Sequence, residues 1–287
     1  MTTKLLRRST ARLTGLIATL ALTAGLTAAP ASADAGPSYV GLGDSYAAGI
    51  GGGEYRVAPE GVPTPCFQTE AAYAAAIYGL NLACSGATTT DVSSNVTTAA
   101  RKASTARTVR TASHIIVTVG ANDIDAAGTT AACAGLASTP QCQTALANAL
   151  GVKLPMLPAK IKSMVNVIKS KAPRAEVALT GYPRLFTITD AMSVEQKLTA
   201  NTINAAVDLL NATIASSALV NRVKYISVTK QFLNHGLGST DPWIVGPSGF
   251  CIPDTCAPAD RPGDVFHPTA KGHEFGYALT IKAALAR

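Results

Sequence analysis

The stretch SYVGLGDSYAAGIGGG, residues 38–53, decides how the rest of the chain is interpreted. A short apolar run ends in the tripeptide GDS at residues 43–45, and a glycine-rich segment follows. Three known loop patterns fail here by spacing. A dinucleotide fingerprint needs glycine where Tyr46 stands, a phosphate-binding loop needs a lysine, and the nucleophile elbow of α/β-hydrolases needs glycine where Ala47 stands. What remains is a serine, Ser45, just beyond the end of a predicted strand.

Apolar, β-branched runs alternate with longer helical patterns along the chain. The strands are expected at residues 39–42, 115–119, 176–179 and 223–228, with a weaker one before Cys84, and the helices at 70–78, 91–110, 143–171, 193–217 and 269–286. This alternation predicts a parallel sheet with helices on both faces. Such sheets bind their ligands beyond the carboxyl ends of the strands, which is where Ser45 stands.

The first 33 of the 287 residues have the pattern of an export signal. A basic start and an apolar stretch, too short and too interrupted for a spanning helix, lead to the small-residue sequence ASA at residues 31–33. Cleavage is expected after Ala33, with Ala35 as the alternative. We expect a secreted protein whose residues 36–287 form one domain. No other segment is judged long and apolar enough to cross a membrane, so no stable membrane insertion is expected.

The charge balance gives little support to a nucleic-acid partner. The signal holds four of the 24 basic residues and none of the 17 acidic ones, so the remainder carries a formal net charge of +3. No arm dense in Lys and Arg with interleaved aromatic residues is present in the sequence. We expect a monomer without nucleic acid.

The six cysteines all follow the predicted signal, and an even number in an exported chain indicates disulfides. Six cysteines allow 15 pairings. The spacing favours three local loops, Cys66–Cys84, Cys133–Cys142 and Cys251–Cys256. No CxxC pair is present, so zinc or thiol redox chemistry is the lesser alternative.

A serine nucleophile needs a base, and the chain has four histidines. Three have a structural interpretation, because one opens an apolar run, one lies in a loop and one lies inside the last helical pattern (His114, His235 and His273). His267 differs, since it follows Asp264 by three residues and precedes Pro268. Across a turn, the aspartate could set the tautomer of the imidazole. The alternative is that Asp264 only caps the last helix.

Two further stretches offer hydrogen-bond donors for an oxyanion. Gly86, in ACSGATT, has no Cβ and can bring a backbone N–H close to a ligand. Asn122 follows a strong strand in VTVGANDIDAA and has a side-chain amide. Taken alone, each stretch is better explained as a turn. The neighbouring Asp44 and Asp123 are expected to fix their loops, and the carboxylates here, with Asp125, show no metal-ligand spacing.

Taken together, the motifs Gly-Asp-Ser, Gly86, Gly-x-Asn-Asp and Asp-x-x-His-Pro fall in one order between residues 41 and 268. This pattern resembles the SGNH, or GDSL, hydrolase superfamily, and the cysteine loops resemble its secreted actinomycete lipases and esterases. One departure is Tyr46, where the common motif has leucine. The resemblance implies a three-layer α/β/α, flavodoxin-like fold with a mainly parallel sheet.

The resemblance also implies residue roles. Ser45 would be the nucleophile, His267 the base and Asp264 its partner, with an oxyanion hole formed by the Ser45 N–H, the Gly86 N–H and the Asn122 side chain. We therefore expect a secreted serine esterase or lipase that hydrolyses acyl lipids or short- to medium-chain esters through an acyl-enzyme, without metal or cofactor. The alternatives are a phospholipase or carbohydrate acetylesterase with the same site, or a non-catalytic binding module. Residues 128–143 and 233–263 are expected to form the pocket walls.

Overall fold

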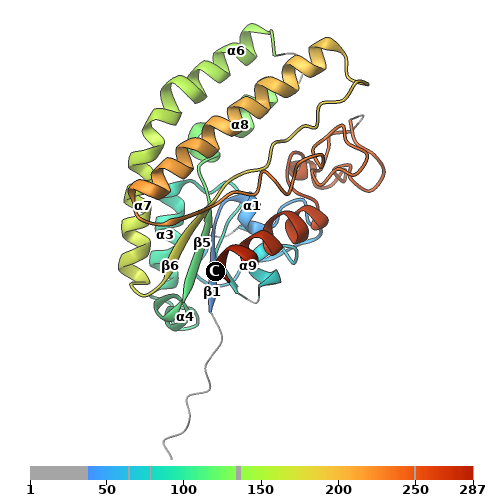
Figure 1. Ribbon diagram of the computed structural model, residues 1–287. Coiled ribbons are helices and arrows are strands. Elements are labelled where there is room, and N and C mark those ends of the chain that lie inside the picture. Colours follow the sequence, from blue (N-terminus) through green and yellow to red (C-terminus); the bar gives the residue numbers. More distant parts are fainter. Residues whose placement is uncertain (1–37, 64, 78, 134–136, 249, 287) are drawn as a thin grey trace, which may run out of the picture. The chain divides into compact units, whose positions relative to one another are not determined.

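Five parallel strands form the central sheet of the computed structural model, which describes residues 38–286 apart from 64, 78, 134–136 and 249 (Figure 1). Across the sheet the strands are β4 (Leu80–Asn81), β1 (Tyr39–Gly43), β5 (His114–Thr118), β6 (Glu176–Thr180) and β7 (Lys224–Ile226). Numbered along the chain within this sheet, the order is second, first, third, fourth and fifth, which is the flavodoxin-like order. The predicted fold class is confirmed. The proposed export signal lies outside the described residues.

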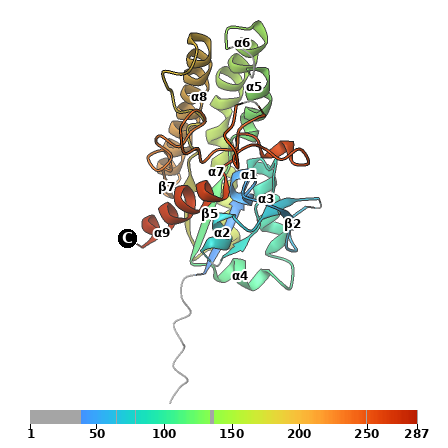
Figure 2. The ribbon, with the colours of Figure 1, turned by 90° about the vertical axis from the view of Figure 1, so that its right-hand side faces the viewer.

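Helices cover both faces of the sheet, as Figures 1 and 2 show. One face carries α3 (Thr89–Ala99), α7 (Leu157–Lys171) and α8 (Val194–Val220), and the other carries α2 (Tyr73–Ala76), the π-helix η5 (Gly272–Ala278) and α9 (Leu279–Leu285). Side chains alternate along each strand, so Ile115 and Val117 join the first core while Ile116 joins the second. Two apolar layers therefore sandwich the sheet.

The remaining elements are short. They are α1 (Ser45–Ala48), α4 (Ala106–Thr111), α5 (Ala126–Ala132), α6 (Pro140–Leu146), the π-helix η2 (Ala147–Lys153), the 3-10 helices η1 (Asn122–Ile124), η3 (Leu154–Met156) and η4 (Pro262–Asp264), and an antiparallel pair of strands, β2 (Tyr55–Val57) and β3 (Phe67–Thr69). The helix expected over residues 91–110 is divided into α3 and α4, and the one over 70–78 contracts to α2, with Tyr78 outside the described residues. The β2–β3 pair has no counterpart among the predicted elements.

The helix α8 is long and apolar enough to cross a membrane by length and composition, with a mean hydropathy of 1.4. The expectation that no segment beyond the signal meets this test is therefore wrong. A packed core helix passes the same test, and α8 contributes Leu210, Ile214 and Ala218 to the core. Its buried Asn204 and Asn211 side chains hydrogen-bond the backbone of the segment after β6. In the described structure α8 packs against one face of the sheet.

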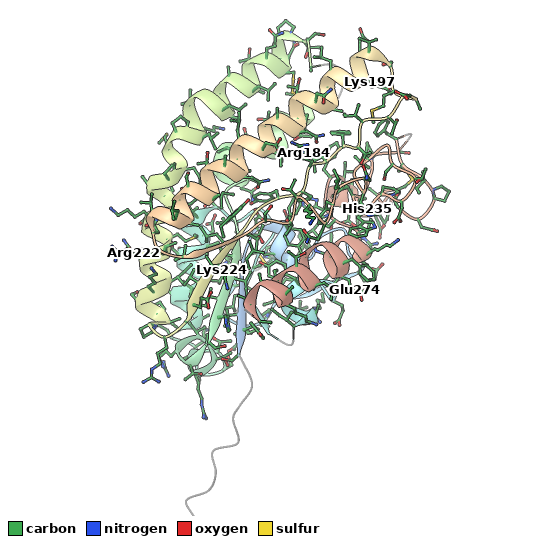
Figure 3. All side chains as sticks on the ribbon, in the orientation of Figure 1. Arg184, Lys197, Arg222, Lys224, His235 and Glu274 are labelled. Carbon is green, nitrogen blue, oxygen red and sulfur yellow. A yellow bond between two sulfur atoms is a disulfide. The ribbon has the colours of Figure 1, made fainter. Side chains whose placement is uncertain are left out.

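The segment after β6 is clamped to α8 along its length. Asn211 bonds both the N–H and the carbonyl of Tyr182, each at 2.8 Å, and Asn204 does the same for Phe186. Between them the Arg184 guanidinium, labelled in Figure 3, pairs with Asp208. These bonds fix the course of residues 182–186, of which all but Arg184 line the cavities described below.

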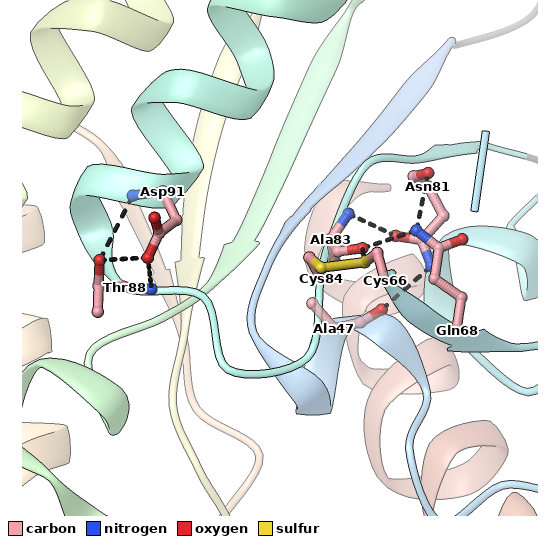
Figure 4. Close-up of a disulfide and its surroundings, with 8 residues drawn as sticks. All are labelled: Ala47, Cys66, Gln68, Asn81, Ala83, Cys84, Thr88 and Asp91. Carbon is pink, nitrogen blue, oxygen red and sulfur yellow. Dashed lines mark hydrogen bonds between the residues drawn. A yellow bond between two sulfur atoms is a disulfide. The ribbon is translucent and has the colours of Figure 1, made fainter. Parts of the chain in front are cut away.

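The three expected disulfides are present, Cys66–Cys84, Cys133–Cys142 and Cys251–Cys256. Figure 4 shows the first of them, which joins the segment before β3 to the segment after β4. Close by, Thr88 and Asp91 form a capping box at the start of α3. The disulfide and the cap hold the two ends of the short segment that contains Gly86.

Candidate active site

Ser45 and Asn122 lie beyond the carboxyl ends of β1 and β5, two adjacent strands. The chain leaves β1 toward one neighbour and returns to β5 on the other side, so this edge is the switch point at which α/β sheets bind ligands. Gly43 makes the turn possible. Its φ is +133°, and a Cβ there would stand 2.0 Å from the carbonyl oxygen of Thr118. The GDS tripeptide therefore forms a tight turn directly after β1, and this turn exposes Ser45 at the edge of the sheet.

Ser45 and His267 form a hydrogen-bonded pair. The Ser45 Oγ lies 2.7 Å from the His267 Nε2, and the His267 Nδ1 lies 3.1 Å from the carbonyl oxygen of Val265. A carbonyl can only accept, so this contact places the proton on Nδ1 and leaves Nε2 free to accept from the serine. Burial lowers the pKa of His267, against the opposing effects of the Val265 carbonyl and the Asp264 charge. Both features favour a neutral imidazole whose Nε2 faces the Ser45 hydroxyl.

The expected hydrogen bond from the His267 Nδ1–H to the Asp264 carboxylate is wrong. That carboxylate is buried, accepts from the Tyr55 hydroxyl at 2.7 Å and pairs with the Arg261 guanidinium at 3.2 Å. The 3-10 turn η4 brings the Asp264 carbonyl, rather than its side chain, to the His267 N–H at 3.0 Å. Asp264 therefore fixes the turn before the histidine, and the Val265 carbonyl orients the ring.

Phe266 adopts a left-handed conformation, with φ at +66°, between Val265 and His267. Such a conformation costs a non-glycine residue on the order of 1 kcal/mol or more and persists only when surrounding contacts fix it. The Phe266 N–H donates to the Val245 carbonyl at 2.8 Å, and its carbonyl accepts from the Tyr46 hydroxyl at 2.5 Å. Burial raises the pKa of Tyr46, which keeps the hydroxyl protonated as a donor. The tyrosine that replaces the common leucine thus ties the serine segment to the histidine segment.

The loops that carry the two candidate oxyanion donors, Gly86 and Asn122, are hydrogen-bonded to each other. The Asn122 Nδ2 donates to the Ala87 carbonyl at 3.0 Å, which leaves its second amide hydrogen for a ligand. Gly86, directly before Ala87, has φ at +81°, and a Cβ there would meet no atom within 4 Å. Its backbone conformation and the open space beside it both suit a close-approaching ligand atom. Behind them Asp123 accepts from the Thr89 N–H and hydroxyl, both at 2.9 Å, as expected of a loop-fixing residue.

A second hydrogen-bond chain links the serine loop to the asparagine loop. Asp44 accepts from the Tyr46 N–H and from the Tyr182 hydroxyl, and that hydroxyl accepts from the Ala121 N–H at 3.2 Å. Burial is the main cause that raises the pKa of Asp44 to about 7. Asp44 therefore fixes its loop, as expected, and Tyr182 lies at the site although no sequence pattern indicated it.

An apolar cavity of about 320 Å³ opens at this site, lined by Ser45, Asn122 and His267 among others. The predicted wall over residues 128–143 contributes Thr129, Thr130 and Ala131. Other walls, which the sequence did not predict, come from α8 and from residues 182–185. The predicted wall over residues 233–263 instead borders a neighbouring cavity.

The other histidines lie in structural contacts. The His273 Nε2 faces the Ile50 carbonyl, His114 pairs with Glu176, and His235, labelled in Figure 3, stacks on Trp243. Among the residues that the structure describes, no group of three or more His, Cys, Asp or Glu side chains is arranged to hold a metal ion.

Comparison with known proteins gives a consistent result. The model of the GDSL-like lipase/acylhydrolase family matches residues 42–275. Lipase 1 of Streptomyces coelicolor is 31% identical over 286 residues, covering 95% of this chain and 98% of that protein. A lipase of Streptomyces rimosus is 30% identical over 283 residues, covering 97% of this chain and 98% of that protein.

Two solved structures share the fold closely. The extracellular lipase of S. rimosus has a TM-score of 0.71 at 28% identity, covering 86% of this chain and 99% of that chain. Phospholipase A1 of Streptomyces albidoflavus has a TM-score of 0.69 at 29% identity, covering 86% of this chain and 98% of that chain. The chain belongs to the GDSL-like lipase/acylhydrolase family and is an ester hydrolase.

Proposed function

We propose that this protein is a secreted serine lipase or esterase that hydrolyses carboxylic esters through an acyl-enzyme on Ser45. The observation that carries the proposal is the 2.7 Å contact between the Ser45 Oγ and the His267 Nε2 at the mouth of an apolar cavity. The Val265 carbonyl, rather than a carboxylate, accepts from the His267 Nδ1–H and orients the imidazole. Ser45 attacks the ester carbonyl while His267 accepts its proton.

The negative oxygen formed in this attack would be stabilised by the Ser45 N–H, the Gly86 N–H and the Asn122 amide. The Ser45 N–H stands at the first position of α1, where it has no acceptor within the helix. His267 then returns the proton to the leaving alcohol, and water releases the acid by the same steps. Asp264 has no direct part in this scheme.

The cavity favours an acyl lipid over an acetylated sugar. Its lining includes Ile124, Leu146, Val207 and Leu210, which suit an alkyl chain and offer a sugar few hydrogen bonds. A phospholipid presents the same kind of chain, so phospholipase activity uses the same site. Likeness to a phospholipase A1 structure supports including it as the second candidate.

Secretion is proposed from three observations. Residues 1–33 have the pattern of an export signal, three disulfides follow it, and one similar structure is that of an extracellular lipase. The mature enzyme would then contain residues 36–287 as a single domain, and we propose that it is a monomer.

A fluorophosphonate probe tests the chemistry directly. We expect the wild-type protein to be labelled at Ser45, located by peptide mass mapping, and the Ser45→Ala variant to remain unlabelled. A non-catalytic binding module would not be labelled at all. Hydrolysis of nitrophenyl esters, triglycerides, phospholipids and acetylated sugars, with Ser45→Ala as the blank, then ranks the substrate classes.

A further inference from the structure

A second cavity, of about 590 Å³, adjoins the one that contains the candidate catalytic pair. Four residues line both cavities, Thr130, Ile203, Val265 and Phe266. The last two directly precede His267, so the two cavities meet along the segment that holds the general base. Both volumes lie in the usual range for small-molecule sites, roughly 300–1,000 Å³.

The walls of the second cavity are mainly apolar and aromatic, and the polar residues that line it are Thr130, Gln196, Thr199 and Ser248. The rings of Phe186, Phe250 and Phe266 lie together, with Phe186 centred 6.2 Å from each of the other two. Met192 and Ala200 add aliphatic surface. None of the described residues that line this cavity carries a charge, so it favours an uncharged apolar group.

The helix α8 runs past both cavities and divides its side chains between them. Ala200 lines only the second cavity, Ile203 lines both, and Ala206 lines only the first. Residues three apart lie on one side of a helix, so these three form a single stripe along α8. The stripe leads from the reaction site into the second cavity, along the helix drawn across Figure 1.

The reaction indicates which part of the ester each cavity would bind. The first contains Ser45 and Asn122, so it receives the acyl carbonyl that Ser45 attacks. His267 must return its proton to the leaving oxygen, so the alcohol departs on the side of the histidine segment. Ser45, Asn122 and His267 all line the first cavity, and the second cavity borders Val265 and Phe266, the two residues directly before His267.

We infer that the second cavity is a subsite for the leaving alcohol and binds an apolar chain that the alcohol carries. The inference rests on the proposed ester hydrolysis and adds a preference to it. The favoured esters carry an apolar chain on both sides of the scissile bond, one in each cavity. Phe266, held by the Tyr46 hydroxyl, borders both subsites.

The test uses two ester series with soluble, monomeric substrates. In the alcohol series the acid is butanoate and the alcohol is methanol, butanol or octanol. In the acyl series the alcohol is methanol and the acid is butanoate or octanoate. We expect the wild-type kcat/KM to rise by about tenfold or more from the methyl to the octyl ester, since each buried methylene favours binding.

Three substitutions on α8 separate the subsites. Ala200→Leu fills the second cavity and should lower the octyl-to-methyl ratio at least about fivefold. Ala206→Leu fills the first and should lower the octanoate-to-butanoate ratio instead. Ala205→Leu is the matched control, because Ala205 is exposed on the same helix, and both ratios should stay at the wild-type values. Phe250→Ala removes an aromatic wall of the second cavity without adding atoms, and should also lower the alcohol ratio.

The outcomes are distinguishable. Hydrolysis with no preference for the alcohol chain, or an Ala200→Leu variant that changes only the acyl ratio, overturns the subsite and leaves the proposed function intact. A wild-type protein that hydrolyses none of these esters overturns the proposed function, and the subsite with it. If Ala200→Leu does not fold, as judged by circular dichroism, an unchanged alcohol ratio in Phe250→Ala is the result that contradicts the subsite.

Discussion

The two halves of the candidate site are held in different ways. On the serine side, regular structure fixes the geometry, because the Asp44 N–H bonds the Thr118 carbonyl at 2.9 Å and continues the register of β1 with β5. On the histidine side, residues 261–268 belong to no strand or α-helix, and side chains some 200 positions earlier hold them. The position of Ser45 therefore follows from the strand register of the sheet, whereas the position of His267 depends on individual long-range hydrogen bonds.

Asp44 and Asp264, two of the buried aspartates, show the same contrast. Asp44 accepts only from neutral donors, and its pKa is raised to about 7. Asp264 is equally buried but has the Arg261 guanidinium beside it. A buried carboxylate beside a cation forms an ion pair, as Asp264 does. A buried carboxyl without a cation, such as Asp44, is stabilised only by the hydrogen bonds that it accepts. Neither touches the imidazole.

The largest expected effect follows from removing the base. His267→Ala should lower kcat on a soluble ester by about 10⁴ or more, as removal of a unit of a serine–histidine pair does. The fold should persist, because the contacts of the imidazole in the described structure are its hydrogen bonds to Ser45 and Val265 and one ring contact with Tyr46. Single-turnover kinetics and circular dichroism measure the two effects. The control is His235→Ala, which removes a histidine stacked on Trp243 away from Ser45.

A second loss is expected on the serine side. Asn122→Ala should lower kcat by about 10²–10³ with little change in KM, the usual effect of removing one oxyanion donor. The control is Asn201→Ala on the exposed face of α8. A wild-type kcat in Asn122→Ala would show that the oxyanion is bound elsewhere.

Substitution of Asp264 tests whether its carboxylate contributes to folding stability or to catalysis. Asp264→Asn keeps an acceptor for Tyr55 but leaves Arg261 without this partner, so unfolding free energy should fall by up to about 3 kcal/mol. The kcat should fall less than about tenfold, because the Val265 carbonyl still orients His267. Urea unfolding and steady-state kinetics on the same sample measure both. A thousandfold loss of kcat at unchanged stability would return Asp264 to the predicted role of the partner of His267.

The sequence predicted the serine side well because local rules govern it. The apolar run, the glycine at a strand end and the order of strands and helices are each visible within a few residues, and they place Ser45 and Asn122 on adjacent strands. The histidine side was predicted only as far as the identity of His267. The choice between the Asp264 carboxylate and the Val265 carbonyl depends on Arg261, Tyr55 and the left-handed Phe266.

The cavity walls show the same limit. The predicted walls are loops, yet Ile203 and Ala206 of α8 line the reaction cavity. A helical period gives the buried face of a helix but does not tell whether that face meets a core or an open cavity. Tyr182 was missed for the same reason, since its hydroxyl reaches Asp44, 138 residues away in the sequence.

A smaller effect is expected at the link between the two halves. Tyr46→Phe removes the hydroxyl that donates to the Phe266 carbonyl and keeps the ring. A net hydrogen bond of about 1 kcal/mol corresponds to a fall of kcat by roughly fivefold, with KM nearly unchanged. Tyr39→Phe, at the far end of β1, is the control. An equal fall in both variants would mean that Tyr46 only contributes to general stability.

The last effect concerns the pH dependence of stability and tests the contrast between Asp44 and Asp264. Since the pKa of Asp44 is raised by burial from 3.8 to about 7, the folded protein retains a proton between these pH values that the unfolded chain releases. The Asp44 contribution to stability therefore falls as the pH rises through this window and levels off above it. Asp44→Asn has no such proton, so its unfolding free energy relative to wild type should improve from pH 5 to pH 8. Urea unfolding at both pH values measures this difference, with the exposed Asp254→Asn as control. A difference that is the same at both pH values would mean that Asp44 is ionised in the fold throughout, with the Tyr182 hydroxyl and the Tyr46 N–H together stabilising the buried charge as effectively as a cation does.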